Sequence, residues 1–152
     1  MDSRNPITIA AISIVTLLLL GIWVISHVDE SYRIKLSELD ANKNLWEKTQ
    51  PLSFNYTVTY GCMMLAKYKI ENEKGRDFEF PIGQTPANES LKIDDIFAQA
   101  EKGIRMSHSV EVKYHPYFGF PELIEVDWDK DIIDDECFFQ ISEFKVSDAN
   151  RT

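Results

Sequence analysis

The N-terminal part of the chain contains a long apolar run. From Ile7 to Val28 there is no Asp, Glu, Lys or Arg, and a helix needs about 20 predominantly apolar residues to cross the hydrocarbon core of a membrane. The run does not end in the small residues that mark the cleavage site of a signal peptide. We therefore expect residues 7–28 to form a transmembrane helix that is retained as a signal anchor.

Charges on the two sides of this run predict its orientation. Arg4 precedes the run, whereas Asp29 and Glu30 follow it. Because positive residues remain on the cytoplasmic side, we expect residues 1–6 in the cytoplasm and the rest of the chain on the extracytoplasmic, periplasmic side. The sequence thus predicts a single-pass protein of the cell inner or plasma membrane, which contacts the membrane through its N-terminal helix.

Two further segments have helical spacing of their apolar residues. Residues 29–49 mix apolar positions with charges and end just before Pro51, which cannot continue a helix, so we expect a juxtamembrane helix there. In residues 92–103, apolar positions recur at intervals of three and four, which predicts an amphipathic helix that ends at Gly103. Its apolar positions are Ile93, Ile96, Phe97, Ala100 and Ile104.

The remaining segments alternate apolar and polar residues, which is typical of strands with one buried face. Three such segments precede the second helix, at 52–60, 64–71 and 78–82, and three follow it, at 110–114, 124–128 and 137–146. The order helix, three strands, helix, three strands, with short links, predicts an α+β fold. We expect residues 50–152 to form an antiparallel sheet of about six strands packed by helices.

Composition narrows the functions that this domain can have. The formal net charge is -9 and the isoelectric point is near 4.8, which excludes nucleic acid as a partner because the phosphate backbone requires a basic surface. The cysteines are Cys62 and Cys137, both in the apolar phase of predicted strands. In an exported domain they predict one disulfide, and the alternative is two buried free thiols.

Several motifs occur along the chain in an order that resembles that of a known family. They are Trp46, the Phe54-x-Tyr56 strand that ends at Cys62, the helix start at 93–97, the segment 112–121 with its His115-Pro116 and Gly119-x-Pro121, and the acidic segment from Asp127 to Glu136. Over residues 44–146 the chain resembles an uncharacterised bacterial family, domain of unknown function 6174. The resemblance implies a small exported or lipid-anchored domain and brings no known activity. The family often has Cys-x-Cys after its first strand. Here Cys62 is followed by Met63 and Met64, so the resemblance favours a bond between Cys62 and Cys137 as a local substitute for that motif.

The acidic segment 127–136 is the strongest candidate for ion chemistry. Acids at alternating positions are typical of a calcium loop, but its sixth position should be glycine and is Ile132, and its twelfth should be glutamate and is Phe138. The alternative is a solvated turn whose carboxylates cap backbone donors. The candidate metal ligands are Asp127, Asp129, Asp131 and Asp135.

An aromatic turn is the candidate contact surface. Tyr117, Phe118 and Phe120 surround Gly119 and could form an exposed patch for a partner, or they could fold back and close the edge of the core. We find no catalytic or cofactor-binding constellation in the sequence. We therefore expect a non-catalytic binding or structural module at the cell envelope, with an envelope protein as its partner. The alternative is an envelope hydrolase or a calcium-binding domain that uses the acidic segment.

Overall fold

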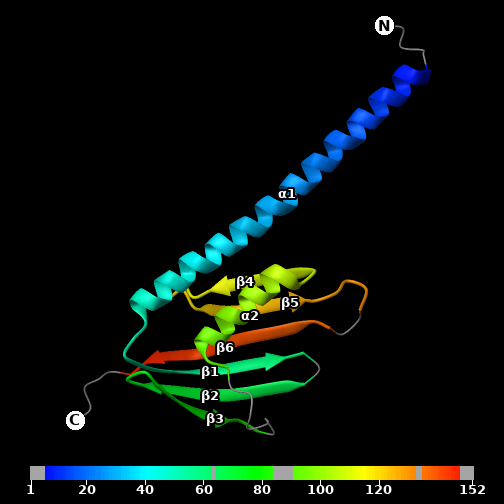
Figure 1. Cartoon of the computed structure of the whole chain (residues 1–152). Coiled ribbons are helices and arrows are strands. Elements are labelled where there is room, and N and C mark those ends of the chain that lie inside the picture. Colours follow the sequence, from blue (N-terminus) through cyan, green and yellow to red (C-terminus); the bar gives the residue numbers. More distant parts are fainter. Residues whose placement is uncertain (1–5, 63, 84–90, 133–134, 148–152) are drawn as a thin grey trace. The chain divides into compact units, whose positions relative to one another are not determined.

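The alternating segments form one antiparallel sheet and the helically spaced segments form two helices (Figure 1). The structure is a computed structural model, and it describes residues 6–62, 64–83, 91–132 and 135–147. In this part of the chain the elements are α1 (Pro6–Thr49), β1 (Ser53–Gly61), β2 (Leu65–Glu73), β3 (Arg76–Pro81), α2 (Ile93–Met106), β4 (Ser109–Tyr114), β5 (Pro121–Asp127) and β6 (Cys137–Val146). The predicted α+β class is confirmed.

The strand order in the sheet is β3-β2-β1-β6-β5-β4, and all neighbours are antiparallel. The first and last strands of the chain therefore lie side by side in the middle of the sheet, and each half of the sheet is a meander of consecutive strands. This order follows from the tendency of consecutive strands to pair, with one long connection through α2. It also brings the end of β1 next to the beginning of β6.

Helix α1 is continuous over the predicted membrane segment and the predicted juxtamembrane segment. The chain divides into two units, residues 1–35 and 36–152. In the first unit, all side chains of residues 9–23 are exposed. Among the residues that the structure describes, no helix combines the length and the apolar character needed to cross a membrane. The predicted span 7–28 includes residues 7, 8 and 24–28, whose side chains lie outside the described ones.

In the second unit, both α2 and the end of α1 cover the same face of the sheet. The apolar positions predicted for the second helix are all buried, at Ile93, Ile96, Phe97, Ala100 and Ile104, and α2 packs on β4 and β5 (Figure 1). On this covered face the central strands contribute fully buried side chains, among them Val58 and Ile70. The alternation in β1, β2, β5 and β6 is therefore the alternation between a covered face and an open face.

The end of α1 is attached to this face by a cluster of aromatic rings. Trp46 is 3% exposed and makes edge-on contacts with Phe54 of β1, Phe120 before β5 and Phe144 of β6, at centroid distances of 5.4, 5.6 and 6.3 Å. Aromatic pairs of this geometry are favourable beyond their burial. Residues that are far apart in the sequence are thus joined at one end of the sheet, and the predicted juxtamembrane helix is part of the domain at least at this end.

Two turns require glycine or its conformational equivalent. Gly119 has a φ of +79°, and a Cβ at this position would lie 2.5 Å from the backbone oxygen of Asn42 and 3.0 Å from Leu45 Cβ, so the turn before β5 lies directly against α1. In the β2–β3 hairpin, Lys74 and Gly75 both have positive φ, at 51° and 82°. Such pairs are typical of two-residue type I′ hairpin turns.

A bulge in β6 adjusts the register at the centre of the sheet. Between the pairs Asn55–Lys145 and Thr57–Ser142, β1 has one residue whereas β6 has two, and Glu143 has a φ of +57°. The Thr57 hydroxyl, which is almost fully buried, donates to Glu143 Oε2 at 3.0 Å. The bulge shifts the phase of β6, so that Phe144 joins the aromatic cluster on the covered face.

Two details of the sequence prediction are wrong. The rings of Phe78 and Phe80 in β3 lie on the open face and are 46% and 48% exposed, because Tyr68 and Ile70 of the covered face pair with Pro81 and Glu79. Helix α2 continues past Gly103 to Met106. A Cβ at Gly103 would lie 3.0 and 3.2 Å from valine methyl groups of β4 and β5, so this glycine permits close packing rather than a helix end.

Candidate functional site

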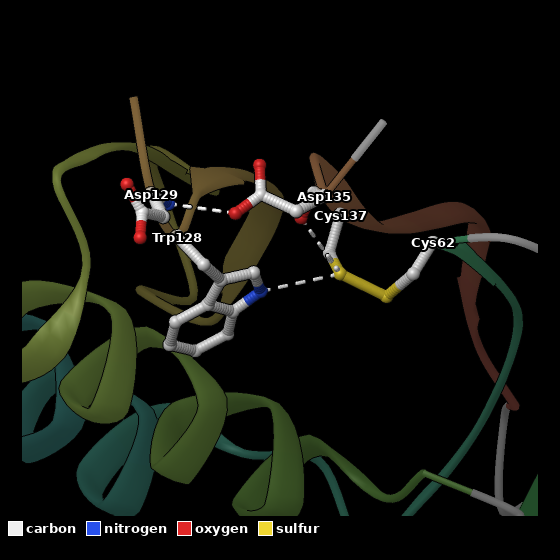
Figure 2. Close-up of a disulfide and its surroundings, with 5 residues drawn as sticks. All are labelled: Cys62, Trp128, Asp129, Asp135 and Cys137. Carbon is white, nitrogen blue, oxygen red and sulfur yellow. Dashed lines mark hydrogen bonds between the residues drawn. A yellow bond between two sulfur atoms is a disulfide. The ribbon is translucent and has the colours of Figure 1, made fainter. Parts of the chain in front are cut away.

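The disulfide lies where the two central strands meet. Gly61, the last residue of β1, pairs with Phe138 of β6, which places Cys62 next to Cys137. Their sulfur atoms are bonded, with a distance of 4.2 Å between the Cα atoms (Figure 2). The predicted disulfide is confirmed. Its two ends differ, however, because β1 ends before Cys62, which is exposed, whereas Cys137 is 7% exposed. The prediction that both cysteines face the core is wrong for Cys62.

Trp128 connects the disulfide to α2. Its indole N–H donates to Cys137 Sγ at 3.3 Å, and the ammonium group of Lys102 lies 4.8 Å from the centre of the same ring. The Asp135 carbonyl oxygen lies 3.7 Å from Cys137 Sγ (Figure 2). A disulfide sulfur carries no hydrogen, so this last approach is a contact in the oxidised protein. The buried sulfur therefore has one hydrogen-bond donor, which is held in place by a cation–π contact.

Carboxylates of the acidic segment accept hydrogen bonds from backbone N–H groups of the same segment. The Asp135 carboxylate accepts a hydrogen bond from the Asp129 N–H at 2.7 Å, and the Asp129 carboxylate accepts one from the Asp131 N–H at 3.0 Å. Among the described residues, no three potential ligands lie close enough to hold a metal ion, although residues 133–134 of the segment are outside this range. Asp129 and Asp131 are exposed, and Asp127 is the last residue of β5. This geometry matches the interpretation as a capped, solvated turn.

A groove of about 500 Å³ lies over β4, β5 and the start of β6. It is lined by Ser109, Val110, Glu111, Glu125, Val126, Asp127, Glu136, Cys137 and Phe138. Because Val126 and Cys137 point to the covered face, the alternation of the strands places the acidic side chains and Phe138 on the open face. The groove has the size of a ligand site, and of the predicted candidates it includes Asp127 and Cys137.

The register of the strands concentrates negative charge in this groove. Glu111 lies directly opposite Glu125, which in turn lies opposite Phe138, and like charges in opposite positions destabilise a sheet. Lys113 partly compensates, with its ammonium 3.2 Å from a Glu111 carboxylate oxygen. In the described part of the chain no ion pair reaches Glu125, Asp127 or Glu136. The groove is therefore an anionic concavity with one aromatic ring in its wall.

The aromatic turn is only in part a surface. Tyr117 is 69% exposed, Phe118 is partly buried, and Phe120 is completely buried. His115 organises this turn, because its Nδ1 accepts hydrogen bonds from the N–H groups of Tyr117 and Phe118, each at 3.2 Å. Phe120 thus belongs to the core, and the predicted contact patch is reduced to Tyr117 and the edge of Phe118.

A polar group beneath α2 was not predicted from the sequence. The Tyr56 phenol is buried under the first turn of α2, and its oxygen accepts a hydrogen bond from the Ile93 N–H. Burial raises the pKa of Tyr56 far above its ordinary value, and the nearby Asp77 carboxylate raises it further. Asp77 accepts a hydrogen bond from Asn72 at 2.7 Å and pairs with Lys92 at 3.3 Å. These contacts fix the start of α2, together with the Asp95 carboxylate, which accepts a hydrogen bond from the Lys92 N–H at 3.0 Å.

The groove carboxylates were also missed as a site. Glu111 and Glu125 stand in the polar phase of their strands, where acids ordinarily serve solubility, and only the register of the strands brings them together. A sequence signal did exist, because Glu111 stands between the half-buried Val110 and Val112, and Glu125 stands between the buried Ile124 and Val126. The tryptophan beside the disulfide was predicted as a strand residue, whereas β5 ends one residue earlier, at Asp127.

Comparison with known proteins gives a family for the chain. The family of unknown function DUF6174 matches over residues 38–146, which is more than two thirds of the chain and contains all six strands, α2 and the end of α1. No curated protein and no solved structure matches the chain. The predicted resemblance is confirmed, and the chain belongs to the family of unknown function DUF6174.

Proposed function

We propose that the chain is a membrane-anchored binding module, which displays the sheet outside the cytoplasm and takes a cationic segment of an envelope protein into the acidic groove. The observation that carries the proposal is the groove of about 500 Å³ on the open face, with Glu125, Asp127 and Glu136 in its wall. A concave site with a few convergent polar groups is the usual form of a binding site. Binding alone is proposed, because the carboxylates of the neighbouring turn cap backbone N–H groups.

Charge complementarity decides the chemical class of the ligand. Glu111 and Glu125 face each other across two strands, and a lysine or arginine side chain between them would relieve their repulsion. Phe138 offers a ring on which the aliphatic part or the cation of such a side chain can lie. The net charge of -9 steers a basic partner towards the chain over longer distances.

The anchor is the second part of the proposal. Residues 7–28 contain no charged residue, and the described side chains of residues 9–23 are all exposed, with Leu17 at 69%. A continuous exposed apolar surface of this kind marks a site of contact with another protein or a membrane, and the hydrocarbon core of a membrane fits a helix of this length. The disulfide supports the extracytoplasmic side, because disulfides persist in oxidising compartments.

The groove is tested by binding of a basic peptide to the full chain in non-ionic detergent. A fluorescent hexalysine peptide is titrated, and its anisotropy is measured at about 0.15 M salt, where the Debye length is about 8 Å. The variant Glu125→Gln with Glu136→Gln should weaken binding roughly two- to thirtyfold, because two exposed ion pairs contribute about 0.2–1 kcal/mol each.

The matched control removes the same net charge elsewhere. Glu47 of α1 and Glu73 of β2 are exposed and lie outside the groove, so Glu47→Gln with Glu73→Gln should change the dissociation constant by less than about twofold, since distant charges are screened. If both double variants weaken binding equally, the peptide responds to net charge and the groove is not the site. Absence of any binding to the unaltered chain also contradicts the proposal.

A further inference from the structure

We infer that Cys62–Cys137 is an exchangeable disulfide that a thiol attacks at Cys62, with Cys137 as the leaving sulfur and Trp128 as the donor that stabilises it. This inference does not rest on the proposed ligand of the groove, although Cys137 also lines the groove. It assigns the chain a second kind of site, one that accepts electrons from dithiols. The substrate class is a small molecule or a protein that presents two thiols close together.

The two sulfur atoms differ in their accessibility to an attacking thiolate. Cys62 follows the last residue of β1, is exposed, and is held by no ladder hydrogen bond of a strand. Cys137 is the first residue of β6, is 7% exposed, and lies between the sheet and the Trp128 indole. Thiol–disulfide exchange requires access to the attacked sulfur along the S–S axis, so Cys62 is the sulfur that reagents reach.

The surroundings of Cys137 suit a leaving thiolate. The Trp128 N–H already points at Cys137 Sγ at 3.3 Å in the oxidised state (Figure 2). The Lys102 ammonium over the same ring keeps the indole in place and makes the N–H a better donor. A hydrogen bond to a charged acceptor is stronger than one to a neutral acceptor, so this bond strengthens as the S–S bond breaks.

The exchange balances in two steps. A thiolate of the dithiol attacks Cys62 Sγ, a mixed disulfide forms there, the Cys62–Cys137 bond breaks, and its electron pair goes to Cys137 Sγ as a thiolate. The second thiolate of the reagent then attacks the sulfur that the reagent contributed to the mixed disulfide, which releases Cys62 as a thiolate and leaves the reagent as a disulfide. The dithiol is oxidised by two electrons and the protein disulfide is reduced by two. Once protonated, the Cys137 thiol has the Asp135 carbonyl oxygen within reach at 3.7 Å.

Nearby charge selects among thiols. Asp135 and Glu136 immediately precede Cys137 in the chain, Asp135 is bonded through its carboxylate to the Asp129 N–H, and Lys102 is the cation in contact with Trp128. The excess of carboxylates repels anionic thiols, whereas cationic thiols are attracted. Per mole of thiolate, cysteamine should therefore react several times faster than 2-mercaptoethanesulfonate, and the difference should vanish at high salt.

The test follows exchange in the full, oxidised chain in detergent. The chain is treated briefly with 2-mercaptoethanol, quenched with acid, alkylated and digested, and the mixed disulfide is located by mass spectrometry. We expect at least about tenfold more adduct on Cys62 than on Cys137, because Cys62 is an exposed residue and Cys137 a buried one. Adduct mainly on Cys137, or in equal amounts on both, overturns the inference.

Rates with dithiothreitol distinguish exchange in the native state from exchange after unfolding. Native-state exchange should keep its rate in dilute urea, whereas a rate that rises in parallel with the unfolded population overturns the inference. Trp128→Phe should slow reduction about three- to tenfold through loss of the donor, and Trp23→Phe, which removes an indole outside the domain, should leave the rate unchanged. An unchanged rate in Trp128→Phe overturns the assignment of Cys137 as the assisted leaving group.

Discussion

Replacement of Gly119 by alanine tests the contact that joins the end of α1 to the sheet. A Cβ at this position would lie 2.5 Å from the Asn42 backbone oxygen and 3.0 Å from Leu45 Cβ, and neither atom belongs to the end of a flexible side chain. The backbone also has a φ of +79°, which costs a non-glycine residue about 1–2 kcal/mol. Overpacking adds about 1–3 kcal/mol, so we expect Gly119→Ala to lower the free energy of unfolding by about 2–5 kcal/mol.

Gly75→Ala is the matched control for this substitution. Gly75 has nearly the same φ, +82°, but a Cβ there meets nothing within 4 Å, so only the conformational cost of about 1–2 kcal/mol applies. Urea unfolding of the full chain in detergent, followed by tryptophan fluorescence, measures both variants, and Trp46 reports directly on this packing. Equal losses in the two variants would refute the close approach of α1 to the turn.

Three more predictions concern other parts of the domain. Replacement of Cys62 and Cys137 by serine and alanine should lower the free energy of unfolding by about 4.5 kcal/mol, because the bond closes a loop of 75 residues; calorimetry that finds less than about 1 kcal/mol contradicts this. Tyr56→Phe should cost about 1–3 kcal/mol near neutral pH, since the Ile93 N–H loses its acceptor. The pKa of Tyr56 is raised in the folded chain, whereas an ordinary tyrosine of the unfolded chain ionises near pH 10. Above that pH the unaltered chain loses stability and the Tyr56→Phe variant does not, so the difference between their free energies of unfolding should narrow as the pH rises. Lys74→Asn should increase the free energy of unfolding by about 0.5 kcal/mol or more and so raise the urea midpoint, because asparagine before Gly75 suits the positive φ of the hairpin turn.

Most of the sheet was predictable because its strands are buried on one side only. Alternation identified β1, β2 and β4, and helical spacing identified every buried position of α2 except Gly103. Alternation did not predict which face of the sheet the apolar residues of β3 occupy. Phe78 and Phe80 are its most apolar residues and yet lie on the open face, because the alternate positions of the same strand, Asp77 and Glu79, pair with covered-face positions of β2. A polar network around Tyr56 and Lys92 decides this orientation, and it forms only in the folded chain.

The candidate sites were likewise predictable only in part. Cys62 and Cys137 had one possible pairing, so the bond was predictable, whereas the exposure of Cys62 depends on β1 ending one residue earlier. The acidic groove depends on the pairing of β4 with β5 and of β5 with β6, which brings Glu125 opposite Glu111. Register of this kind is set by contacts across the sheet and by the turn geometry, and a single strand's sequence contains neither.

The location of the domain is tested most directly by its accessibility to protease in intact spheroplasts of a bacterial host that expresses the full chain. If residues 7–28, which contain no charged residue, span the bilayer as we propose, the chain should stay with the membrane in alkaline carbonate. Proteinase K added outside should then remove the domain that contains Cys62 and Cys137, while a cytoplasmic marker remains intact until the cells are lysed. Release of the chain by carbonate, or protection of the domain until lysis, would contradict an anchored extracytoplasmic module.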